Sequence, residues 1–160
     1  MGINFLLLLV LGLASAEECP VEFTEIHGHC YLFSQQLGEN KQSQEQARLF
    51  CQMLSQDDYT VDLATLGHFA AAEADPLLAH IYENDLADGG LWLGAERSGE
   101  SFMWVDGRHL SEKSHLFYYL EPNGNDCIAV RPDLTNNDMH RNYINDAICT
   151  HAYNFVCETF

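Results

Sequence analysis

The chain contains the stretches Glu121-Pro122-Asn123-Gly124-Asn125-Asp126-Cys127 and Asn145-Asp146-Ala147-Ile148-Cys149, and each ends in a cysteine. A disulfide between these two cysteines would bring both stretches onto one small surface. That surface would hold the side-chain oxygens of Glu121, Asn123, Asn125, Asn145 and Asp146. Calcium takes about six to eight such oxygen ligands in flexible geometry. The two stretches therefore predict a calcium site.

A calcium ion near the surface, with coordination positions unused by the protein, can bind two neighbouring sugar hydroxyls. The stretches accordingly predict calcium-dependent carbohydrate binding. The same residue types are also common in ordinary turns, so a short Glu-Pro-Asn motif has little meaning by itself. Its interpretation depends on the cysteine framework around it.

The first residues have the pattern of a secretory signal peptide. An apolar run from Phe5 to Leu13 precedes the small-residue cleavage signal Ala14-Ser15-Ala16. We therefore expect a signal peptide over residues 1–16, one domain over residues 17–160, and a secreted, extracellular protein. The remaining chain has no apolar stretch of spanning length, so no membrane span is expected.

The number of cysteines and the net charge limit the class of protein and its possible partners. Six cysteines in an exported chain predict three disulfides, although spacing alone leaves their pairing open. The net charge of −17 argues against nucleic acid or an anionic membrane as partner. It is compatible with calcium and neutral glycans, and solubility alone would explain most of it.

Local patterns predict helices in the first half of the chain. A small hairpin is expected between Cys19 and Cys30, with Gly28 at its turn. Ser43 and Gln46 form a capping-box pattern that starts a helix, whose apolar residues recur at helical spacing. These residues are Ala47, Phe50, Cys51 and Leu54. A second helix is expected within 69–86, its regular part starting at Pro76.

The second half of the chain contains short apolar or alternating runs separated by turn residues, which predict short strands. The expected strands are Leu91–Ala95, Phe102–Val105, Cys127–Val130 and Asn154–Cys157. Because helices come first and strands later, the predicted fold class is α+β.

The order of these features resembles the long form of the C-type lectin domain over nearly all of residues 17–160. The resemblance rests on Cys19-Pro20, Cys30-Tyr31, Cys51, Trp92-Leu93-Gly94, Trp104-Val105-Asp106-Gly107, Glu121-Pro122-Asn123, Cys127, Asn145-Asp146, Cys149 and Cys157. It implies a fold of two helices, two small antiparallel sheets and a long calcium-binding loop. It also implies the disulfides Cys19–Cys30, Cys51–Cys157 and Cys127–Cys149, with Trp92 and Gly94 on the core strand. As large aromatic side chains, Trp92 and Trp104 are expected in the core.

The resemblance also implies roles for the site residues. Calcium would be held by Glu121, Asn123, Asn125, Asn145 and Asp146, all but Asn125 also contacting sugar. The Glu-Pro-Asn order resembles the subgroup that binds equatorial hydroxyl pairs, as in mannose or N-acetylglucosamine. Two departures from the family concern length: the segment from Glu121 to Cys127 looks short, and residues 132–141 look like an insertion. A third concerns charge: Asn125 stands where the family usually has glutamate, which removes one carboxylate from the site. We expect weak calcium binding.

Other functions have less support in the sequence. The eight histidines form no spaced ligand set with the cysteines, and no hydrolase motif is present, so neither structural zinc nor an enzyme is expected. By resemblance, the chain would serve pattern recognition or agglutination in innate immunity, with self-association supplying avidity. The alternative is a module of this fold that binds a protein or mineral surface without sugar.

Overall fold

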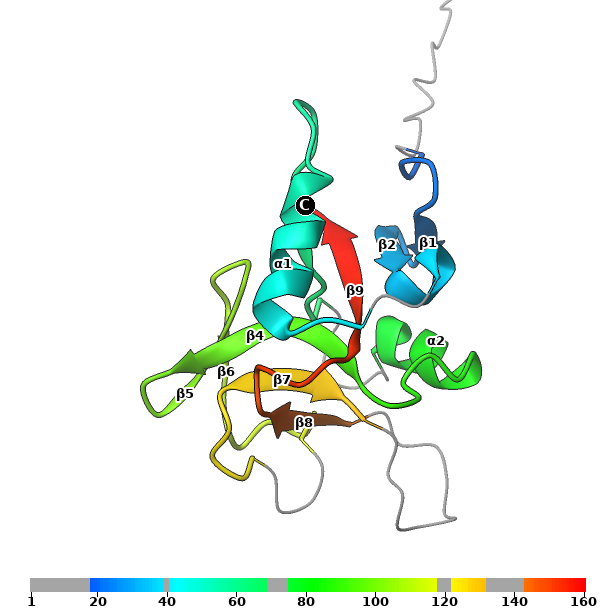
Figure 1. Cartoon of the computed structure of the whole chain (residues 1–160). Coiled ribbons are helices and arrows are strands. Elements are labelled where there is room, and N and C mark those ends of the chain that lie inside the picture. The colour runs from blue at the N-terminus through cyan, green and yellow to red at the C-terminus, as the bar shows by residue number, and fades with distance from the viewer. Residues whose placement is uncertain (1–17, 39–40, 69–74, 118–121, 132–142) are drawn as a thin grey trace, which may run out of the picture.

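The computed structural model describes residues 18–38, 41–68, 75–117, 122–131 and 143–160 (Figure 1). Within these residues the chain forms nine strands, two α-helices and one short 3-10 helix. In chain order they are β1 (Thr24–Ile26), β2 (His29–Phe33), η1 (Ser34–Leu37), α1 (Gln44–Met53), β3 (Val61–Leu63), α2 (Pro76–Glu83), β4 (Leu91–Ser98), β5 (Ser101–Trp104), β6 (His109–Leu110), β7 (Cys127–Val130), β8 (Ile144–Ala147) and β9 (Asn154–Thr159).

The amino-terminal hairpin forms as the sequence predicts. Strands β1 and β2 pair antiparallel, and Gly28 turns between them with a φ of 83°. Glycine suits this left-handed conformation because it has no Cβ to clash. The disulfide Cys19–Cys30 fastens the segment before β1 to β2.

Both predicted helices are confirmed, with their starts where the sequence places them. The Ser43 hydroxyl accepts a hydrogen bond from the Gln46 backbone amide, and the Gln46 side-chain oxygen accepts one from the Ser43 backbone amide. These two bonds form the capping box of α1. Ala47 and Cys51 are buried on the inner face of this helix. Helix α2 begins at Pro76, and the preceding Asp75 caps its free amides.

The last strand joins the two halves of the molecule. Strand β9 pairs antiparallel with both β2 and β3, and parallel with β4. Antiparallel pairing then extends from β4 through β5 to β6, and separately through β7 to β8. The expectation of two separate antiparallel sheets was therefore wrong in one respect, because the parallel β4–β9 pair connects them into one network.

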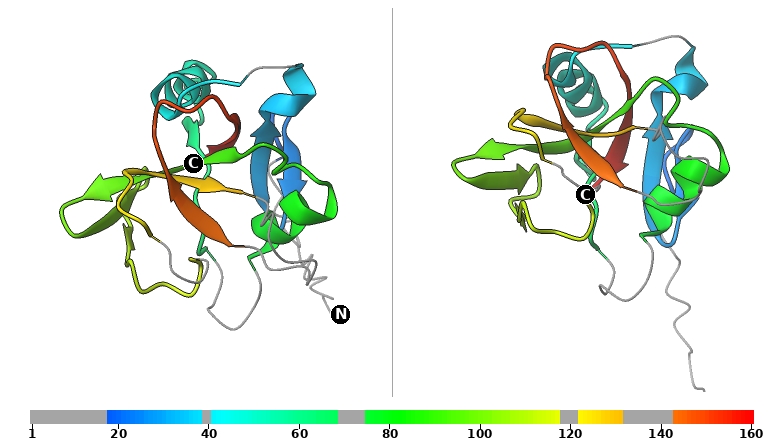
Figure 2. Two further views of the ribbon diagram at one scale, coloured as in Figure 1. Left: turned by 60° about the horizontal axis from the view of Figure 1, so that its bottom comes forward. Right: turned by 90° about the horizontal axis from the view of Figure 1, so that it is seen from below.

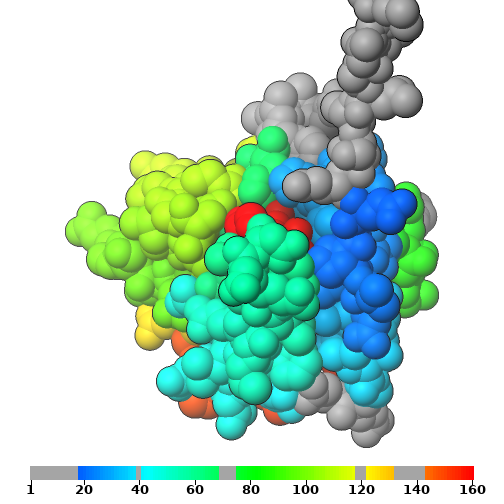
Figure 3. All heavy atoms as spheres, turned by 90° about the horizontal axis from the view of Figure 1, so that it is seen from above, coloured from blue at the N-terminus to red at the C-terminus, as the bar shows by residue number. Residues whose placement is uncertain are grey.

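The views agree on how these parts are arranged. The hairpin, α1 and β9 occupy one half of the molecule, whereas β7 and β8 lie at the opposite end with β4 between (Figures 1 and 2). Seen from above, the segment of α1 and the amino-terminal hairpin adjoin, and part of β9 is visible where they meet (Figure 3). The described residues of the two stretches that predict a calcium site therefore lie at the β7–β8 end.

Three short strands were not predicted: β3, β6 and β8. Strand β3 lies between the two helices in the sequence and, like β1 and β2, precedes α2. The rule that helices come first and strands later was therefore wrong, although the α+β class is confirmed. Segments of two to four residues gain strand geometry from pairing with distant strands, so local periodicity does not reveal them.

The expected positions of Trp92, Gly94 and Trp104 are confirmed. Trp92 is fully buried on β4, where its Nε1 donates to the Gln42 carbonyl at 2.9 Å, and Trp104 is buried on β5. Gly94 lies where β4 meets β3, and a Cβ there would come within 2.6 Å of the Leu63 carbonyl oxygen. Only glycine allows this close approach of the two backbones.

Among the described residues, no helix has the length and apolar character needed to cross a membrane. The predicted signal peptide, residues 1–16, lies outside the described residues.

Candidate functional site

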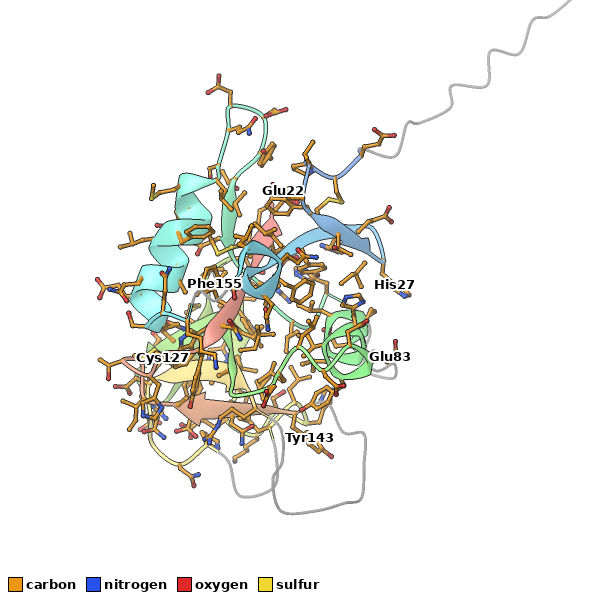
Figure 4. All side chains as sticks on the ribbon, turned by 45° about the vertical axis from the view of Figure 1, so that its right-hand side comes forward. Glu22, His27, Glu83, Cys127, Tyr143 and Phe155 are labelled. Carbon is orange, nitrogen blue, oxygen red and sulfur yellow. A yellow bond between two sulfur atoms is a disulfide. The ribbon has the colours of Figure 1, made fainter. Side chains whose placement is uncertain are left out.

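The two stretches that suggested a calcium site meet in the structure. The disulfide Cys127–Cys149 forms, and β7 pairs with β8 in a register that places Ile128 opposite Asp146. Residues 122–126 lead directly into β7, whereas Asn145 and Asp146 belong to β8. Figure 4 shows Cys127 below the first turn of α1, and its Sγ lies 3.3 Å from the Gln44 Oε1.

Asp146 holds the segment before β7 in place. Its side chain is 3% exposed, and its Oδ1 accepts the Asn123 backbone amide at 2.7 Å. Its Oδ2 accepts the backbone amide of Asn125. A buried carboxylate requires such donors, because burial without them would cost several kcal/mol. The structure thus brings Asn123, Asn125 and Asp146 into one group.

The other predicted ligands stand as follows. Asn123 is exposed, Asn125 is half-buried, and the half-buried Asn145 precedes Asp146 on β8. Glu121 and the insertion 132–141 lie outside the described residues. The described members of the set therefore offer one buried carboxylate and three amides at or near the surface.

Arg97 on β4 also holds this segment in place, and no pattern in the sequence predicted this role. Its Nε and Nη2 donate to the Asn125 carbonyl oxygen at 3.1 and 3.0 Å, and its backbone amide donates to the Asp126 carbonyl at 2.7 Å. On the other side, its Nη1 donates to Glu112 at 2.7 Å, and this hydrogen bond raises the pKa of Arg97 above its ordinary value. The guanidinium also lies over the Phe102 ring.

Asp126, a further carboxylate close to the predicted ligands, is directed toward this arginine. Its Oδ1 lies 3.2 Å from the Arg97 Nε, and its side chain is 70% exposed. Such an exposed pair contributes little stability. In this structure, then, the Asp126 carboxylate is paired with Arg97.

The donor set fits calcium chemically. Its side chains offer carboxylate and amide oxygens, the hard ligands that calcium prefers. Each Asp146 oxygen accepts a backbone amide, and a carboxylate oxygen can accept more than one bond. The main chain of Asn125 is fixed by Asp146 and Arg97, so these contacts do not engage its side-chain amide.

Comparisons with known proteins identify the fold. No model of a protein family matches the chain. The human asialoglycoprotein receptor 2 is 24% identical over 149 residues, which are 88% of this chain and 40% of the receptor. The chain thus spans about two fifths of the length of that relative.

Solved structures agree with this match. The C-type lectin CEL-I from Cucumaria echinata superposes with a TM-score of 0.67 at 19% identity, over 89% of this chain and 98% of that one. The C-type lectin domain of murine dendritic cell inhibitory receptor 2, solved with an N-glycan, gives 0.62 at 20% identity, over 88% and 98%. The chain therefore has the C-type lectin fold, as the sequence resemblance predicted.

Proposed function

We propose that this chain is an extracellular, non-enzymatic binding module for sugars with equatorial vicinal hydroxyls, of the mannose and N-acetylglucosamine type. Calcium would be held by Glu121, Asn123, Asn125, Asn145 and Asp146. The observation that supports this best is the buried Asp146, whose two oxygens gather the backbone of Asn123 and Asn125. Such a network prepares one end of the β7–β8 pair for a ligand.

A bound calcium ion would supply two coordination positions for adjacent sugar hydroxyls. The residues around it would supply the complementary hydrogen bonds. A carboxylate such as Glu121 would accept a hydrogen bond from a sugar hydroxyl, whereas the amide groups of Asn123 and Asn145 would donate hydrogen bonds to hydroxyl oxygens. This alternation of acceptor and donor would select neighbouring hydroxyls that lie equatorial on the ring.

Calcium affinity should be modest. The set contains two carboxylates because Asn125 replaces a third, and affinity follows the charge count of the ligands. We expect dissociation constants on the order of 10⁻⁴–10⁻³ M, the range of extracellular calcium modules. Arg97 adds a nearby positive charge that acts in the same direction.

The setting is also part of the proposal. Three disulfides accord with an oxidising, extracellular environment, with residues 1–16 as signal peptide and 17–160 as the domain. A single sugar site is weak, so we propose self-association as the source of avidity. Pattern recognition or agglutination in innate immunity would be the corresponding role.

The test is retention of the refolded domain on mannose-agarose in millimolar calcium, followed by elution with EDTA. Galactose-agarose is the matched control column. Retention on mannose that EDTA reverses supports the proposal. The variant Asn123→Asp, which exchanges an amide donor for an acceptor, should lose this retention.

The second candidate is a module that binds a protein or mineral surface without sugar. The observation that favours it is the net charge of −17. The acidic residues are dispersed along the chain rather than run together, which counts against a mineral-binding surface. If neither the mannose nor the galactose column retains the domain, this second candidate becomes the better supported function. If Asn123→Asp is retained as well as the original chain, the assignment of Asn123 to the site is wrong.

A further inference from the structure

Glu158 is a buried acid far from the proposed sugar site. It lies on β9 with a side chain that is 0% exposed. Its Oε2 accepts the backbone amide and the hydroxyl of Thr65, at 2.9 and 3.1 Å. The Tyr31 hydroxyl donates to its Oε1 at 3.4 Å. A buried carboxylate also needs a compensating positive charge, and hydroxyl and amide donors carry none.

Two histidine side chains lie against Glu158 in the described part of the chain. His29 Nδ1 and His68 Nε2 each lie 3.1 Å from the same oxygen, Oε1. The two imidazole rings stack with centroids 4.5 Å apart. Their side chains are 32% and 19% exposed, so the cluster is buried on the carboxylate side and reaches solvent on the histidine side.

We propose that His29, His68 and Glu158 bind a divalent transition-metal ion, zinc in the first instance. The three ligand atoms already lie within 4.8 Å of one another. Zinc bonds to imidazole nitrogen and carboxylate oxygen are about 2.0–2.2 Å long, which puts neighbouring ligands of a tetrahedral site roughly 3.3 Å apart. The two 3.1 Å separations are close to that spacing.

The chemistry of the ligands separates this cluster from the calcium site. Imidazole suits zinc, copper and nickel, whereas calcium prefers oxygen. Three protein ligands would leave a position of a tetrahedral zinc site for water or another ligand. The site would join β2, the segment after β3, and β9, and would therefore also fasten the hairpin to the centre of the fold.

The surroundings orient the carboxylate toward the histidines. Thr65 occupies Oε2, so that Oε1 faces both imidazoles, as outer hydrogen bonds orient ligands at metal sites. The Thr65 hydroxyl also lies 2.7 Å from the His68 Nε2, a contact that a bound metal ion would replace. Burial is the main cause that raises the pKa of Tyr31, followed by the charge of Glu158, so this hydroxyl remains a neutral donor. Burial likewise lowers the pKa of His68, against the opposite effect of Glu158, and favours the neutral imidazole that a metal requires.

The positive charge of Arg108 would weaken metal binding at this cluster. The Nη2 of Arg108 lies 3.5 Å from the His68 Nε2 and donates to the Thr65 hydroxyl at 2.9 Å. Its Nε lies 2.6 Å from Asp106, whose carboxylate offsets the guanidinium charge. The cluster, counted with both arginine and aspartate, retains the negative charge of Glu158.

The experiment is a zinc titration of the EDTA-stripped, refolded domain by calorimetry near neutral pH, in millimolar calcium to fill oxygen sites. We expect one ion per chain with a dissociation constant in the micromolar range or below. Cobalt in place of zinc should give the visible absorption bands of a tetrahedral site. His29→Gln and His68→Gln should each weaken zinc binding by about tenfold or more. His109→Gln, at an exposed histidine on β6, is the matched control and should leave it unchanged.

Zinc binding that is weaker than millimolar, or that survives both substitutions, would overturn the proposal and leave the cluster a hydrogen-bonded network only. Melting curves without metal establish that the two variants fold. Mannose retention of the same variants tests independence, because a failure of sugar binding leaves the zinc result intact. Asp146→Asn should conversely leave zinc affinity unchanged.

Discussion

Asp146 has a structural role in the fold, and in the proposed function it would also serve a binding site. Its carboxylate is buried, yet both of its oxygens accept backbone amides from a segment that is otherwise largely exposed. Those two bonds determine where Asn123 and Asn125 lie. A change at Asp146 should therefore affect both ligand binding and loop geometry.

The substitution Asp146→Asn tests that role. Asparagine can accept one of the two amides, but its own NH₂ would face the other and remove that bond. We expect calcium affinity to fall by about tenfold or more, with an unfolding free energy lower by about 1–3 kcal/mol. Calcium titration by calorimetry and urea denaturation measure the two effects.

Asp126→Asn is the matched control, because Asp126 is exposed and pairs with Arg97. It should change calcium affinity much less. Equal calcium affinity in Asp146→Asn and the original chain would show that Asp146 is not a ligand.

Arg97→Lys separates geometry from charge at the same segment. Lysine keeps the positive charge near Asp146 but lacks the planar fork that donates twice to the Asn125 carbonyl. We expect calcium affinity to fall several-fold while the helical signal in circular dichroism stays the same. Calorimetry checks the affinity. An unchanged value would mean that Asp146 alone positions the segment.

At the scale of elements, α1 is fastened to the sheet by a polar side chain as well as by apolar contacts. Gln44, at the first position of the helix, is 1% exposed. Its Nε2 donates to the Leu93 and Ala95 carbonyls of β4 at 3.1 and 3.0 Å. These carbonyls border Gly94, where β4 and β3 approach closely.

The substitution Gln44→Leu keeps the size of this side chain and removes its donor. The Leu93 and Ala95 carbonyls would lose a partner in the interior, so we expect the unfolding free energy to fall by about 2–3 kcal/mol. Glu45→Leu, at the next and exposed position of the same turn, is the control and should change it by less than about 0.5 kcal/mol. Urea denaturation measures both. A cost no larger than that of the control would show that water replaces the lost donor.

The same elements show what sequence can predict. The start of α1 follows from Ser43 and Gln46, and that of α2 from Pro76, because capping depends on neighbours within one helical turn. Strand β8 could not be found this way, since its pairing partner β7 lies beyond a long segment. Arg97 and His68 were missed for the same reason. Each meets its partners, Asn125 and Glu158, only through tertiary structure.

Across the whole molecule, the last strand determines how distant parts meet. Cys157 on β9 lies opposite Leu32 of β2 and Leu63 of β3, and its disulfide reaches Cys51 on α1. Figure 4 shows the neighbouring Phe155 in the middle of the molecule. Position 157 therefore connects β2, β3 and α1, which are distant in the sequence.

Removing the disulfide at that position should cost more than removing one in the hairpin. Cys51–Cys157 spans 106 residues and Cys19–Cys30 spans 11, and a longer loop restricts the unfolded chain more. We expect Cys51→Ala with Cys157→Ala to lower the unfolding free energy by about 4–5 kcal/mol, and the Cys19 and Cys30 pair by about 2–3 kcal/mol. Guanidinium denaturation of both double variants gives the comparison. Equal losses would mean that local packing around each disulfide, rather than loop length, sets its contribution to stability. Strand β9 would then stabilise the fold through its strand pairs alone.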